Sequence, residues 1–141
     1  MRKVLLGLFV LVAVLVALPR VILFAQGATP MRLVTAPFQP ISLGCAGVGI
    51  PDVTVMWDAD GDVVCVRNDA PGPAPLSWPW GYSAWMVDGK VEIVKPEGTV
   101  LAYGGDRLGS LGGCPRDDGT ILVDAGIGGS AITVTRTKIS Q

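Results

Sequence analysis

Residues 76–106 read LSWPWGYSAWMVDGKVEIVKPEGTVLAYGGD, an aromatic opening followed by three short runs with strand spacing. Each run is about five residues long, the usual length of a strand, and is rich in β-branched or aromatic residues. Asp88-Gly89 separates the first two runs and Pro96-Glu97-Gly98 the last two, and both sequences are typical of tight turns. The runs are residues 83–87, 91–95 and 99–103. The stretch therefore predicts a meander of three antiparallel strands.

Apolar and charged side chains alternate along this meander. The apolar positions are Val91, Ile93, Val100 and Ala102, and the charged ones are Lys90, Glu92 and Lys95. Because successive side chains of a strand point to opposite faces, the pattern predicts one buried face and one wet face.

Further strand-like runs flank the meander on both sides. They cover residues 53–57, 63–67, 120–123 and 131–139. After the first 25 residues, no run has the 3.6-residue apolar period of an amphipathic helix. The sequence therefore predicts an all-β fold, a small antiparallel barrel or sandwich preceded by one N-terminal hydrophobic helix.

Residues 1–25 form an apolar segment behind a short basic end. Met1-Arg2-Lys3 precedes the unbroken apolar run Val4–Leu18, and apolar character resumes after Pro19-Arg20. As a helix, residues 4–25 would be about 33 Å long, enough to cross a bilayer. Two interpretations stay open: a retained membrane anchor with a cytoplasmic N-terminus, or a signal peptide cut near Gly27. Both predict export of the remaining chain.

The segment after the leader is rich in proline. Residues 26–40 contain Pro30, Pro37 and Pro40, which favours an extended tether over regular structure. A strand-like stretch at residues 32–35 leaves open that this segment supplies the first strand of the domain. The exported β domain is then residues 41–141, a length typical of a single domain.

The net charge of the exported part indicates which classes of partner it can bind. Three of the eleven basic residues lie in the first 27, so eight remain against twelve acidic residues. A mildly acidic domain lacks the basic face that follows a phosphate backbone. We therefore expect no nucleic-acid partner.

The chain has three cysteines, Cys45, Cys65 and Cys114. In an exported domain two of them are expected to form a disulfide. Cys45 and Cys114 lie in glycine-flanked loops that have room for a bridge, whereas Cys65 lies inside a strand-like run, where a lone Cys usually acts as a small buried hydrophobe. The sequence favours the pair Cys45–Cys114.

Four aromatic residues fall within eight positions: Trp78, Trp80, Tyr82 and Trp85. Such a group could stack on a sugar face or grip a proline-rich segment. It could equally be the plug of a small barrel, where large aromatics supply much of the buried area. Pro79 interrupts a regular strand ladder here, so we expect at least one indole to be accessible.

The acidic loop of residues 58–62 alternates carboxylates before and after a glycine. Asp58, Asp60 and Asp62 could present oxygen ligands to calcium. The alternative is a hairpin loop with solvated acids, because no bidentate Glu follows at the spacing of a full calcium loop. We name these three residues as a weak calcium site and expect no other metal or cofactor.

This composition offers few side chains that could act in catalysis. The chain has no His, which excludes the acid–base and nucleophile schemes that depend on an imidazole. A hydrolase with paired carboxylates would have to use turn-located acids, namely Asp58, Asp60, Asp106 or Asp124. We expect no enzyme.

Several turn and packing motifs resemble those of a family of small exported bacterial proteins and lipoproteins of unassigned function. They are Trp78-Pro79-x-Gly81-Tyr82-Ser83, Asp88-Gly89-x-Val91-Glu92-Ile93, Gly98-x-Val100-x-Ala102, Gly105-Asp106 and Gly112-Gly113 before Cys114. The resemblance covers roughly residues 43–123. It implies an OB-like β-barrel with Cys45 and Cys114 as disulfide partners. Cys65 and Pro115 depart from the family pattern.

These features together predict a non-catalytic module of the cell envelope, either secreted or tethered to the membrane by its N-terminal helix. The predicted contact with an envelope protein or polymer is the aromatic region of residues 78–85. A calcium-stabilised structural domain is the alternative, and a carboxylate hydrolase the remaining one.

Overall fold

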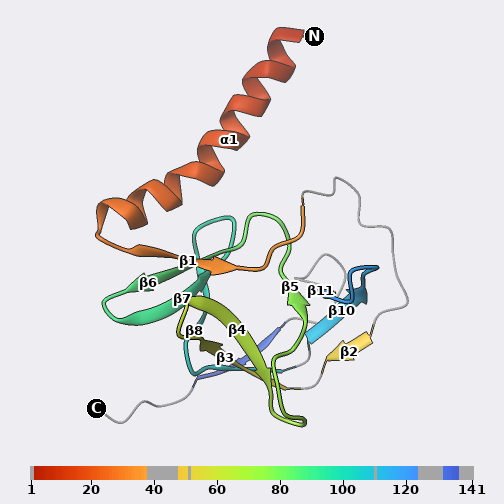
Figure 1. Ribbon diagram of the computed structural model, residues 1–141. Helices are drawn as coiled ribbons and strands as arrows, with labels where there is room; N and C mark the ends of the chain where they lie inside the picture. Colours follow the sequence, from red (N-terminus) through yellow and green to blue (C-terminus); the bar gives the residue numbers. More distant parts are fainter. Residues whose placement is uncertain (1, 38–47, 51, 110, 124–131, 137–141) are drawn as a thin grey trace.

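The computed structural model describes residues 2–37, 48–50, 52–109, 111–123 and 132–136 (Figure 1). These residues form one helix, α1 (Arg2–Ala25), followed by a mostly β body. The strands are β1 (Thr29–Leu33), β2 (Val48–Ile50), β3 (Val53–Trp57), β4 (Asp62–Arg67), β5 (Leu76–Ser77), β6 (Ser83–Val87), β7 (Lys90–Val94), β8 (Val100–Tyr103), β9 (Arg107–Gly109), β10 (Leu111–Pro115), β11 (Ile121–Val123) and β12 (Thr133–Thr135). The predicted succession of one hydrophobic helix and an all-β domain is confirmed at this level.

Eight strands form one sheet in the order β12-β9-β3-β4-β1-β6-β7-β8. A tight corner between β8 and β9 brings the two ends of this sheet together. At the corner, the amide of Gly104 donates to the carbonyl of Val91 on β7, and the amide of Gly105 donates to that of Val55 on β3. The sheet is therefore nearly closed and barrel-like, which leaves few unpaired strand edges.

The predicted meander is confirmed as β6, β7 and β8, all antiparallel. Asp88 and Gly89 both have positive φ, 49° and 76°, which a two-residue hairpin turn requires. Between β7 and β8 the register shifts after Ile93, so that Val94 pairs with Val100. Because of this irregularity, Val100 contacts the opposite side of the sheet from Ala102.

β1 fits the alternative that the proline-rich segment supplies the first strand of the domain, at residues 29–33 instead of the strand-like residues 32–35. Its first half pairs antiparallel with β6, from Thr29 to Met31, and its second half pairs parallel with β4, at Arg32 and Leu33. β1 therefore joins the two halves of the large sheet. Pro30 is tolerated because β6 is its only paired neighbour, so its missing amide interrupts no second ladder.

A four-stranded sheet, in the order β2-β10-β11-β5, packs beside the barrel and shares its core. β5 pairs parallel with β11, whereas β2 and β11 flank β10 in antiparallel fashion. Gly113 of β10 lies so close to β11 that an added Cβ would be 2.5 Å from a methyl carbon of Ile121. Close strand packing thus explains Gly113, whereas an added Cβ at Gly112 would meet nothing within 4 Å.

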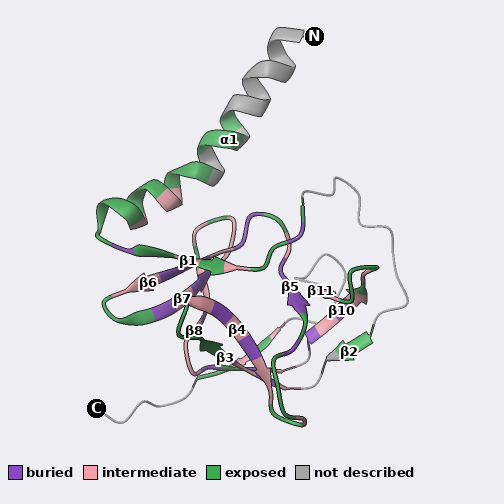
Figure 2. Cartoon of the chain, viewed as in Figure 1, coloured by how far each residue is buried: buried purple, intermediate pink, exposed green. Residues whose placement is uncertain are grey.

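The main core lies inside the barrel (Figure 2). Apart from Trp78, its fully buried members come from strands of both sheets: Val53, Val55, Val91, Ile93, Ala102, Leu108, Leu111 and Val123. The predicted inward face of the meander is confirmed at Val91, Ile93 and Ala102.

A second, smaller cluster lies on the outer face of the meander and corrects the prediction that this face is wet. Ala28, Trp85 and Val94 are buried there, and Leu23 of α1 packs against them. The last turns of α1 thus cover apolar side chains that point away from the barrel interior. None of the helical structure in the described ranges combines the length and hydropathy needed to cross a membrane.

Candidate functional site

The structure divides the four aromatic residues of the predicted binding region. Trp78, Tyr82 and Trp85 are 2, 9 and 6% exposed, whereas Trp80 is 47% exposed. The plug interpretation therefore holds for three of them, and the predicted four-residue platform is wrong. The expectation of at least one accessible indole is confirmed at Trp80.

Trp78 and Tyr82 belong to the main core. Their ring centroids are 5.6 Å apart with a tilted arrangement. The Trp78 backbone is paired with the segment after β1, donating to the carbonyl of Val34 and accepting from the amide of Ala36. Burial raises the pKa of the Tyr82 hydroxyl, and the nearby Glu97 carboxylate adds to this effect. Both rings serve packing, and neither presents a face to a ligand.

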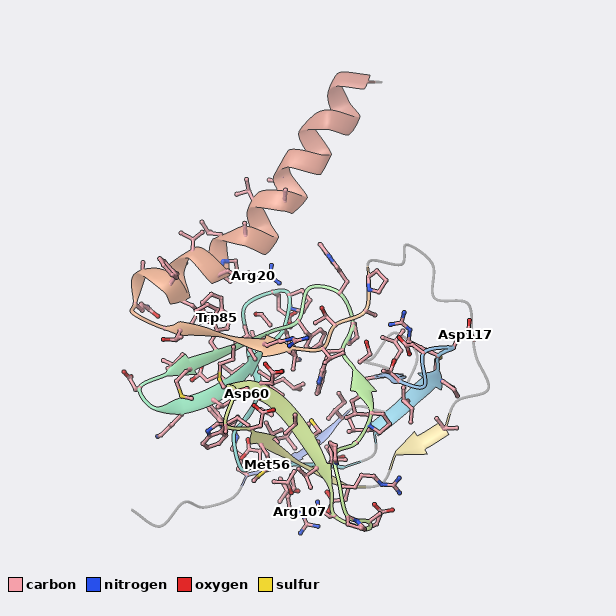
Figure 3. The ribbon with its side chains drawn as sticks, in the orientation of Figure 1. Arg20, Met56, Asp60, Trp85, Arg107 and Asp117 are labelled. Carbon is pink, nitrogen blue, oxygen red and sulfur yellow. The ribbon has the colours of Figure 1, made fainter. Side chains whose placement is uncertain are left out.

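Trp85 faces the opposite side of the sheet, toward α1. Its indole Nε1–H donates to the Ser83 hydroxyl at 3.0 Å, and its ring packs with Ala28 and Val94 under Leu23. In Figure 3 it is drawn beside the end of the helix, near Arg20, while Met56 and Arg107 lie on the far side of the barrel. Trp85 therefore attaches the helix end to the sheet.

Trp80 sits on a short turn that three contacts hold in place. The amide of Tyr82 donates to the carbonyl of Pro79 at 3.3 Å, and Gly81 adopts a φ of 94°. Pro96 packs so tightly on Gly81 that an added Cβ would be 2.9 Å from its Cγ. Arg20 of α1 donates from a terminal guanidinium nitrogen to the Gly81 carbonyl at 2.7 Å. The half-exposed indole is thus carried by a fixed turn.

Trp57 is a second accessible aromatic that the sequence did not single out. It shares a strand face with the buried Val53 and Val55, but it is the last residue of β3 and is 46% exposed at the barrel rim. One edge of its ring packs on Gly104, where an added Cβ would be 2.7 Å from Cζ3. The strand end, next to the acidic loop, is the signal that could have identified it.

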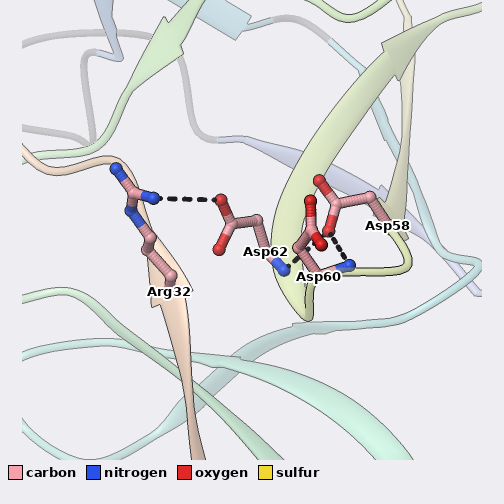
Figure 4. Close-up of polar contacts among 4 residues, drawn as sticks. All are labelled: Arg32, Asp58, Asp60 and Asp62. Carbon is pink, nitrogen blue, oxygen red and sulfur yellow. Dashed lines mark hydrogen bonds and ion pairs between the residues drawn. The ribbon is translucent and has the colours of Figure 1, made fainter.

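The acidic loop forms a hairpin turn and corrects the calcium prediction (Figure 4). One oxygen of Asp58 accepts from the amides of Asp60 and Asp62, at 3.0 and 2.9 Å. The carboxylate of Asp62 faces Arg32 of β1 at 3.4 Å. Across the residues that the structure describes, no group of three acidic, His or Cys side chains is placed to hold a metal.

The structure describes one of the two other carboxylates that were named for a hydrolase. Asp106 is buried at the β8–β9 corner, where one carboxylate oxygen accepts from the Tyr103 amide at 2.9 Å while its own amide donates back to the Tyr103 carbonyl. It therefore fixes the turn that closes the barrel. Asp124 lies outside the described residues.

The described cysteines have different states. Cys65 is a free thiol buried in the core, and burial raises its pKa to about 12, so it stays protonated and unreactive near neutrality. Cys114 is disulfide-bonded. Cys45 lies outside the described residues, so the pairing of Cys45 with Cys114 stays a prediction, which non-reducing peptide mapping would check.

Comparison of the chain with protein families, with curated proteins and with solved structures found no match.

Proposed function

We propose that the protein is an exported, non-catalytic module of the cell envelope that contacts a partner or polymer outside the cytoplasm through Trp80. In this proposal the accessible Trp80 contacts the partner, and the three buried rings stabilise the fold. The observation on which this rests is the 47% exposure of Trp80 on a turn held by Pro96 and by Arg20. A large indole in a fixed position loses little conformational entropy when it binds, which suits a recognition contact.

The lack of catalytic groups supports the non-catalytic part of the proposal. The chain has no His, and the carboxylates of Asp58 and Asp106 are occupied by backbone amides of their own turns. A paired-carboxylate mechanism needs two such groups across a cleft with separated pKa values. The calcium alternative is not carried forward, because Asp58 and Asp62 are engaged within the protein.

Export is proposed from the basic end and apolar run of the first 25 residues, and membrane association through α1 belongs to the same proposal. The relation to small exported bacterial proteins, with an OB-like barrel, also stays a proposal. The nearly closed, largely antiparallel sheet supports it. Removal of residues 1–27 after export would take away the Arg20 hydrogen bond to the Trp80 turn and leave the Pro96 contact in place.

A photo-crosslinking amino acid placed at position 80 tests the proposal in intact host cells. We expect a light-dependent adduct from position 80 and several-fold less from position 57, the matched half-exposed Trp on the far end of β3. Equal yields at the two positions, or no adduct at position 80, would show that Trp80 is not the contact.

A further inference from the structure

The end of α1 is built to turn sharply into the barrel. Gly27 has a φ of 79°, its amide donates to the carbonyl of Phe24, and the amide of Ala28 donates to that of Leu23. This is the Schellman arrangement, in which a left-handed glycine ends the helix and an apolar contact accompanies it. The contact is present here, because Leu23 packs against the buried Ala28.

Three contacts fix the helix end against the turn before β6, the outer face of the meander and the loop between β7 and β8. Arg20 donates to the Gly81 carbonyl, and Leu23 packs into the outer cluster. Pro19 lies against Gly98, where an added Cβ would be 2.8 Å from the Cβ of Pro19. These contacts place the helix end directly beside the Trp80 turn.

The same helix end exposes an apolar surface. Its exposed large side chains are Leu18, Val21, Ile22 and Phe24, which are 49–69% accessible. At about 100° per residue they spread over nearly half of the helix circumference, on the sides that the barrel does not cover. A protein groove covers one stripe of a helix, whereas lipid covers every free side. The wide angular spread of these apolar side chains therefore favours lipid as the medium that covers them.

We propose that this helix end and the Trp80 turn form one continuous lipid-contact surface, with Trp80 at the level of the headgroups. The inference rests on the proposed function and names the partner that Trp80 meets. Arg20 donates a hydrogen bond to the carbonyl of Gly81. Trp80 directly precedes Gly81 in the chain, so the Cα atoms of Trp80 and Gly81 lie about 3.8 Å apart. Trp has an apolar ring and one polar N–H, a combination that favours the boundary between acyl chains and headgroups. The sequence Pro79-Trp80-Gly81 is itself uncharged, and the charge at this turn is that of the Arg20 guanidinium, which donates to the Gly81 carbonyl.

Tryptophan quenching in vesicles tests the inference on the full chain. The protein is reconstituted in phosphatidylcholine–phosphatidylglycerol vesicles whose lipids carry bromine either near the headgroup or deep in the acyl chain. We expect the shallow bromines to quench more strongly than the deep ones. This quenching should fall by more than half in Trp80→Phe and persist in Trp57→Phe, with unchanged far-ultraviolet circular dichroism in both variants.

Equal quenching in wild type and Trp80→Phe, or none in either, would overturn the inference. The crosslinking experiment separates this failure from failure of the proposed function. Adducts of position 80 with a protein or glycan, together with no bromolipid quenching, would leave the envelope-binding proposal standing and remove the lipid assignment. No adduct and no quenching would remove both.

Discussion

Replacing Trp78 with Ala is expected to lower the free energy of unfolding by about 3–5 kcal/mol, a large part of the 5–15 kcal/mol typical of a domain. The ring is 2% exposed, stacks near Tyr82 and lies among core residues of both sheets. Its removal leaves a cavity where the barrel meets the smaller sheet. Chemical denaturation followed by circular dichroism measures the loss.

Trp80→Ala is the matched control, because it removes the same side chain two positions away. Its half-exposed indole contributes little to the core, so we expect a change within about 1 kcal/mol. Equal losses for the two variants would contradict the division of the aromatic region into a buried plug and one surface residue.

The second large effect concerns β1. A chain that begins at Val34 lacks this strand and is expected to show no cooperative unfolding transition. Without β1 the halves β12-β9-β3-β4 and β6-β7-β8 lose the strand that pairs with both β4 and β6, and the barrel is left open between them, joined at the β8–β9 corner. Thermal unfolding of the purified chain is the measurement.

A chain that begins at Ala28 keeps β1 and serves as the control. It loses the Arg20 hydrogen bond and the cover of Leu23 over Trp85 and Val94, which together are worth about 2–4 kcal/mol. We therefore expect it to fold with reduced stability. The same transition in both shortened chains would show that residues 29–33 are a dispensable tether.

The meander could be predicted because its signals are local. Asp88-Gly89 and Pro96-Glu97-Gly98 specify turns by their own backbone preferences, and the alternation around Val91 and Ile93 marks the inward face. The outer face could not be predicted in the same way. It is covered by Leu23, which is some seventy positions earlier in the chain, and no local pattern reports that contact.

For a related reason the sequence leaves β1 open as an alternative to a tether. Pro30 argues against a strand when the sequence is considered alone, and it is harmless only because β4 begins its pairing two residues later, at Arg32. Whether Trp78 and Trp80 are buried or exposed also depends on the fold. The two residues flank Pro79 and look alike in sequence, yet the pairing of Trp78 with Val34 draws it inward, while the turn at Gly81 leaves Trp80 outside.

Hydroxyl-radical footprinting of the folded full chain, read by mass spectrometry for each indole, tests the central claim most directly. The claim is that the aromatic region presents Trp80 alone and that lipid then covers it. We predict rapid modification of Trp57 and Trp80, protection of Trp78 and Trp85, and a selective loss of Trp80 modification when vesicles are present. Modification of Trp78 as fast as that of Trp80, or a Trp80 rate that vesicles leave unchanged, would contradict it.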